Sequence, residues 1–133
     1  MMILNPILYG IDSMFILRYF ASIGMGSNVL VEHTTTTILV GLVIHYLLSL
    51  LFTLIISIVI HRWGMVVGLV GGAILGLAIY AINFYTMTVF FEWMFAIKSP
   101  LMVIAHIIFG AVAGGVYEAL DDYDEGIGQE IAQ

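Results

Sequence analysis

Charge is scarce in this chain. Only 9% of its 133 residues are charged, 62% are hydrophobic, and the mean hydropathy is +1.15. A soluble domain carries about 25% charged residues, so this composition is typical of a membrane protein. The net charge of −6 comes mainly from acids near the C-terminus, and the three Lys or Arg residues are too few for a basic surface. We therefore expect no binding of nucleic acid.

Cysteine is absent altogether. Its absence excludes disulfides, thiolate metal sites and cysteine nucleophiles. The sequence also has no spacing that suggests a nucleophile with its base, a phosphate-binding loop or a pair of catalytic carboxylates. We therefore expect a protein that is not an enzyme.

Long apolar runs are what the chain has in abundance. The clearest covers residues 36–61 and contains no Asp, Glu, Lys or Arg. Roughly 25 residues extend about 37 Å as a helix, which exceeds the ~30 Å hydrocarbon core of a bilayer. Small or polar residues recur at every fourth position of this run and so share one helix face, the seam. The seam residues are Thr37, Gly41, His45, Ser49, Thr53, Ser57 and His61. We expect other helices to pack along this seam, with Gly41 and Ser49 at the contacts.

Two further apolar runs, residues 65–85 and 101–120, are predicted to span the membrane. Both contain glycines at four-residue spacing, and such rows let two helix backbones approach closely in lipid. The glycines are Gly68, Gly72 and Gly76 in the first run and Gly110 and Gly114 in the second. His106 precedes the second row in the same register. We expect both rows to pack against the seam of the first span, within one chain or between copies.

The segments around these runs are more polar. Residues 6–23 contain an acid and an arginine, so we expect an N-terminal helix that lies at the membrane interface or makes a short span. Residues 86–100 form an aromatic connector at headgroup level, and residues 121–133 form an acidic, loose tail. The expected fold class is all-α: residues 1–133 form one membrane domain, a polytopic helical bundle of three transmembrane helices plus the N-terminal helix.

Four polar side chains inside the apolar runs are candidates for function, because a polar group within a membrane is a functional hypothesis by default. They are His45, Tyr80, Asn83 and His106. Antiparallel connectivity places all four in the same half of the bilayer, which predicts an intramembrane polar cluster. Three interpretations of this cluster remain open. The imidazoles form hydrogen bonds between helices, or they ligate a haem or a metal, or the cluster lines a path or pocket for a small ligand, a quinone or a proton.

Four segments carry a resemblance to a known family. They are RYFASIGMGSNVL (18–30), VGLVIHYLLSLLF (40–52), YAINFYTMTVFFEW (80–93) and AHIIFGAVAGGVY (105–117). In these segments the chain resembles small, uncharacterised bacterial inner-membrane proteins that automated annotation often labels "sodium:proline symporter". The resemblance implies a multi-pass protein of the bacterial inner (cytoplasmic) membrane. Symporters use inverted repeats and broken helices around a midplane site, and three short spans provide neither unless several copies assemble.

The chain is rich in packing motifs and poor in reactive groups. This balance favours a non-catalytic integral membrane protein, either an accessory or packing subunit of a membrane assembly or a homo-oligomer. The expected partners are the lipid bilayer and either further copies or other membrane subunits, and no cofactor is expected. Two alternatives remain: a subunit that binds haem, a metal or a small ligand such as a quinone through His45 and His106, and an oligomeric small-solute transporter or channel.

Overall fold

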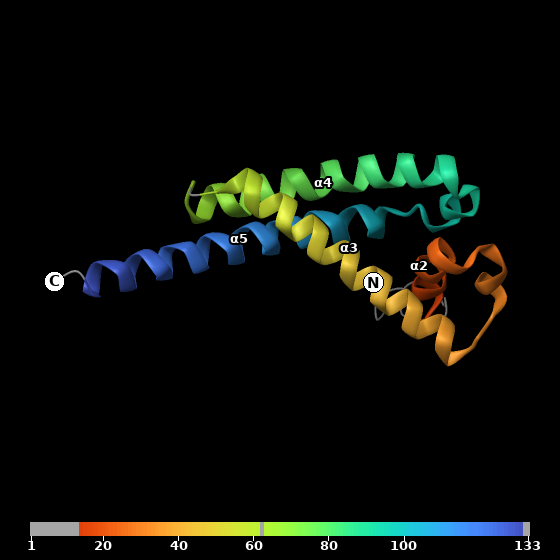
Figure 1. The fold of residues 1–133 in the computed structure, drawn as a ribbon. Helices are drawn as coiled ribbons and strands as arrows, with labels where there is room; N and C mark the ends of the chain where they lie inside the picture. Colours follow the sequence, from red (N-terminus) through yellow and green to blue (C-terminus); the bar gives the residue numbers. More distant parts are fainter. Residues whose placement is uncertain (1–13, 62, 132–133) are drawn as a thin grey trace. The chain divides into compact units, whose positions relative to one another are not determined.

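The structure is a computed structural model that describes residues 14–61 and 63–131, with side chains up to residue 121. Throughout this range its elements are helices, in the order α2, η1, α3, α4, η2 and α5 (Figure 1). Their bounds are Phe15–Met25 for α2, Ser27–Val31 for the 3₁₀ helix η1, Thr35–Ile60 for α3, Met65–Phe90 for α4, Glu92–Ile97 for the 3₁₀ helix η2 and Pro100–Ile131 for α5. The expected all-α class is confirmed.

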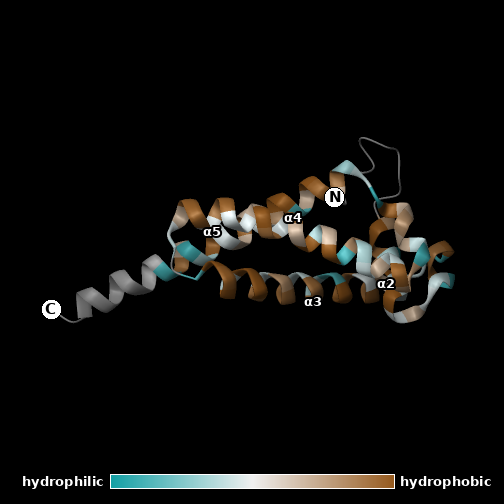
Figure 2. Ribbon diagram, turned by 90° about the horizontal axis from the view of Figure 1, so that it is seen from above, coloured by the Kyte–Doolittle hydropathy of each residue, from teal (hydrophilic) through white to brown (hydrophobic). Residues whose placement is uncertain are grey.

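Three of these helices are long and apolar enough to cross a membrane: α3, α4 and the Pro100–Asp121 part of α5. Hydrophobic residues run along all three, whereas hydrophilic residues gather in the links (Figure 2). The protein is therefore a multi-pass helical bundle with three candidate spans and a shorter N-terminal helix. That helix, α2, has 11 residues and extends about 16 Å, roughly half the length of a span. Residues 6–13 of the expected N-terminal helix lie outside the described residues.

Hydroxyl groups cap the first and third long helices. The backbone N–H of Thr37 donates to Oγ1 of Thr34 at 3.2 Å, just before α3 begins. The N–H of Met102 donates in the same way to Oγ of Ser99 at 3.2 Å, and Pro100 is the first residue of α5. Such N-caps satisfy one of the backbone donors that every helix leaves free at its start, and proline is preorganised for the first helical position. The starts of both spans are thus encoded locally.

Two helices extend farther than the sequence analysis expects. The second span continues to Phe90, and the Thr88 hydroxyl donates within this helix, to the carbonyl of Phe84 at 2.9 Å. α5 does not end in a loose tail but continues to Ile131. Residues 121–131 contain no proline, and extending a helix that has already formed costs far less than starting one.

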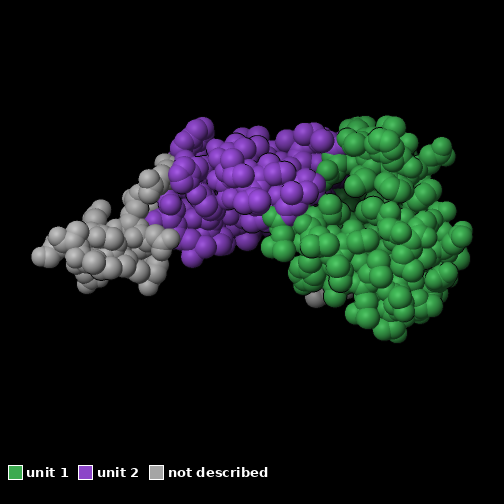
Figure 3. All heavy atoms as spheres, viewed as in Figure 1, with its two compact units in different colours: residues 1–50, 83–102 green, residues 51–82, 103–133 purple. Residues whose placement is uncertain are grey.

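The chain forms two compact units, which Figure 3 distinguishes by colour. Unit 1 combines Met1–Leu50 with Asn83–Met102, and unit 2 combines Leu51–Ile82 with Val103–Gln133. Unit 1 therefore contains α2, η1, the first part of α3, the end of α4, η2 and the start of α5. Unit 2 contains the last part of α3, the turn between α3 and α4, the first part of α4 and most of α5.

In unit 1, α2 packs closely on the first part of α3. Gly41 is buried, and a Cβ atom at this position would come within 3.0 Å of the backbone carbonyl of Leu17. One turn farther along α3, the ring of His45 lies with its centroid 4.7 Å from that of Phe20 on α2. The first part of the seam is thus covered by α2.

In unit 2, the glycines of α4 and α5 face one another. A Cβ atom on Gly72 would come within 3.0 Å of the carbonyl group of Gly110, and one on Gly114 would come within 3.0 Å of the carbonyl group of Gly68. Real Cβ atoms essentially never approach so closely. Each step of four residues along α4 is matched by a step of four residues back along α5. The two helices therefore form an antiparallel hairpin with backbones in contact and a fixed register.

This pairing differs from the expected contact of both glycine rows with the seam of α3. Two rows of equal spacing interlock, and α3 instead contributes branched side chains that pack beside the hairpin. Ile56 and Ile60 of α3 are 0% and 2% exposed and form a core with Ile79 of α4. The seam residue Ser57 donates its hydroxyl within its own helix, to the carbonyl of Leu54 at 2.9 Å.

Replacing Gly72 by alanine tests the close contact, and Gly71 provides the matched control. The methyl group of Gly72→Ala overlaps the backbone of α5, so we expect a loss of about 1–3 kcal/mol in the free energy of unfolding, the usual cost of overpacking. A Cβ atom on Gly71 would have its nearest neighbour, Ile60, at 3.8 Å, so Gly71→Ala is expected to change little. Reversible unfolding in mixed micelles measures both variants. Equal stability of the two variants would contradict the contact.

Candidate functional site

The four residues of the predicted polar cluster lie in both units. Tyr80 and His106 belong to unit 2 and contact each other edge to face, with ring centroids 5.3 Å apart. His45 and Asn83 are half-buried in unit 1, where His45 stacks on Phe20. The structure thus brings one pair of the four together within a unit, and the complete cluster stays a prediction.

The contact between Tyr80 and His106 continues the glycine hairpin. A Cβ atom on Gly76 would come within 3.0 Å of the backbone carbonyl of His106, so the helices are still in backbone contact here. Tyr80 lies four residues farther along the same row of α4.

The predicted packing residue Ser49 of α3 is half-buried and donates its hydroxyl to the carbonyl of His45 at 2.9 Å, within its own helix.

At the other end of the same hairpin lies Glu118, which is 1% exposed. One carboxylate oxygen accepts a hydrogen bond from the backbone N–H of Trp63 at 3.1 Å, and the other accepts from the N–H of Gly64 at 2.9 Å. These N–H groups stand at the start of α4, where a helix has unsatisfied donors and a partial positive charge. A carboxylate from α5 therefore caps α4, and we call this contact the clasp.

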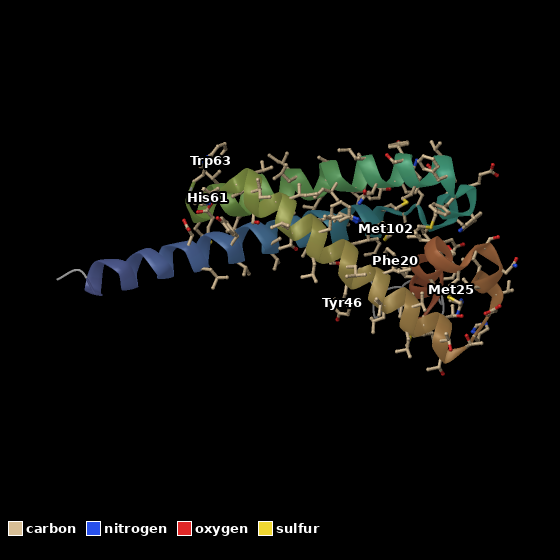
Figure 4. The ribbon with its side chains drawn as sticks, viewed as in Figure 1. Phe20, Met25, Tyr46, His61, Trp63 and Met102 are labelled. Atoms are coloured by element: carbon tan, nitrogen blue, oxygen red, sulfur yellow. The ribbon has the colours of Figure 1, made fainter. Side chains whose placement is uncertain are left out.

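The turn beside the clasp is shaped by Gly64, whose φ of +86° favours glycine over residues with a Cβ atom. Just before this turn, Nδ1 of His61 forms a hydrogen bond with the hydroxyl of Tyr117. His61 and Trp63 are labelled at this turn in Figure 4. Two neighbouring residues of α5, Tyr117 and Glu118, thus bind the end of α3 and the start of α4.

Glu118 is not among the predicted site residues. Two signals could have found it. It is the only acid within residues 101–120, and it continues the four-residue row of His106, Gly110 and Gly114. A Cβ atom on Gly68 would come 2.6 Å from its Cγ, so the carboxyl-bearing side chain occupies the space that this glycine leaves. In this hairpin, the acid in register with the glycine row caps the facing helix.

Unit 1 has its own polar layer. Arg18 of α2 is 6% exposed, and its Nη1 lies 3.2 Å from Nδ1 of His33. Ser22, one turn along α2, accepts a hydrogen bond from the indole N–H of Trp93 at 2.9 Å and donates to the carbonyl of Tyr19 at 2.7 Å. The aromatic connector is thereby tied to the N-terminal helix.

Burial affects the titration of one group in this layer. Desolvation raises the pKa of the Tyr19 hydroxyl above its usual 10.0, and the neighbouring positive charge of Arg18 partly opposes the rise. The phenol therefore stays neutral over the physiological range.

At the start of α3, the hydroxyl of Thr37 lies 2.8 Å from that of Thr34 and donates to Glu32 at 3.4 Å.

The connector also holds the cation of Lys98. Its Nζ lies 5.7 Å from the ring centroid of Phe84 and 5.4 Å from that of Phe95, within the range of a cation–π contact. Phe84 is buried, whereas Phe95 and Lys98 are exposed. An amine above aromatic rings, with its charge accessible, suits the headgroup level that the sequence predicts for this segment.

The contacts in both units tie helices, caps and links together. Among the described residues, no three His, Asp or Glu side chains gather in a way that could hold a metal ion. The clasp carboxylate has both oxygens on backbone donors. Chemically, these contacts give hydrogen-bond partners to backbone and side-chain polar groups where helices begin, end and meet.

Comparison with known proteins gives no match: no family model, no curated protein and no solved structure matches the chain. The family resemblance therefore stays a prediction.

Removal of the clasp carboxylate tests its role. Glu118→Ala removes the acceptor of two N–H groups at the start of α4, and a hydrogen bond to a charged group contributes about 1.5–3 kcal/mol. Glu118→Gln keeps the shape and one carbonyl oxygen, so we expect a smaller loss in the free energy of unfolding. Glu92 is an exposed carboxylate, and Glu92→Gln is expected to stay within about 0.5 kcal/mol of the wild type. The clasp is refuted if Glu118→Ala is as stable as Glu92→Gln.

A double-mutant cycle tests the tie between the connector and α2. Trp93→Phe keeps an aromatic ring but removes the N–H donor, and Ser22→Ala removes its acceptor. We expect the two changes to couple by about 0.5–1.5 kcal/mol, the usual net worth of one hydrogen bond. Thr88→Ala serves as the control partner, because its hydroxyl bonds within α4, and its combination with Trp93→Phe should be additive. If the changes at Trp93 and Ser22 are additive as well, the two side chains do not form a stabilising hydrogen bond.

Proposed function

We propose that this multi-pass membrane protein is non-catalytic and serves as an accessory or packing subunit of a membrane assembly or as a homo-oligomer. The observation that carries the proposal is the use of the buried clasp. Glu118 is a carboxylate 1% exposed, the type of residue that within a membrane suggests transport or proton transfer. Both of its oxygens accept from backbone N–H groups, which is a structural use.

The hydroxyl groups of the spans support the same function. Ser49, Ser57 and Thr88 each donate to a carbonyl three or four residues earlier in their own helix. A hydroxyl engaged in this way needs no partner from another helix or from a substrate. Such spans present apolar side chains outward, to lipid or to another subunit.

The glycine hairpin supports a rigid role rather than a moving one. Backbones in contact at Gly68, Gly72 and Gly76 leave no room for one helix to slide past the other without a clash. Close packing of this kind is the main source of helix association in lipid. A subunit that stabilises an assembly needs a shape of this kind, which holds one register.

The state of the protein in its native membrane tests the proposal. After extraction in mild detergent and chemical cross-linking, we expect a species larger than one chain, either of identical copies or with other membrane subunits. If assembly depends on the hairpin, Gly72→Ala should reduce this species and Gly71→Ala should preserve it. A lone monomer that co-isolates with nothing would overturn the proposal.

Cofactor binding by His45 and His106 is the alternative, and an absorption spectrum separates it from the proposal. We expect protein purified from native membranes to show no Soret band. A Soret band that disappears in His45→Ala and in His106→Ala, but persists in His61→Ala, would favour a haem-binding subunit. His61 is the suitable control because its ring is bound to Tyr117.

A further inference from the structure

We draw no further inference here: the strongest candidate, the exposed apolar face that α3 presents from Leu39 to Ile58, carries nothing, because nothing in the structure shows what covers it.

Discussion

The contact between the backbones of α4 and α5 is the constraint on which unit 2 depends. In lipid, apolar side chains gain little by leaving their surroundings for one another, so helices associate through close packing and polar contacts. Glycine permits the closest packing, because it brings no Cβ atom between the backbones. At Gly72 and Gly110 each residue occupies the space that a side chain on the other would need. The contact thus fixes the distance between the helices and their register together.

The clasp follows from that register. Once Gly68 lies opposite Gly114, the next turn of α5 brings Glu118 to the start of α4, where free N–H groups require an acceptor. A carboxylate is costly to bury alone, but here it accepts two hydrogen bonds at the positive end of a helix. In unit 1, side-chain hydroxyl groups accept from the backbone N–H groups at the starts of helices. The indole N–H of Trp93 donates to the hydroxyl of Ser22.

The parts that sequence could predict are those encoded within one helix. Apolar length identifies the three spans, and four-residue spacing identifies the glycine rows. The sequence does not reveal which rows meet, because Gly72 is equally suited to the seam of α3 and to Gly110. The clasp is not predictable for the same reason: Glu118 gains its role from a partner 54 residues away in sequence, and a single helix does not reveal that partner. The sequence does not predict the extension of α5, because its acidic run indicates the end of the membrane part, although a formed helix continues through acids at little cost.

The contacts of the polar side chains in the spans bear on what the protein does. A polar side chain in a membrane span needs a hydrogen-bond partner. For Glu118, Ser49, Ser57 and Thr88 this partner is a backbone N–H or carbonyl group. Each of the two histidines of the predicted cluster lies against an aromatic ring, Phe20 for His45 and Tyr80 for His106. The polar groups of Glu118, Ser49, Ser57 and Thr88 thus serve the helices themselves, which is the use that the proposed packing role requires.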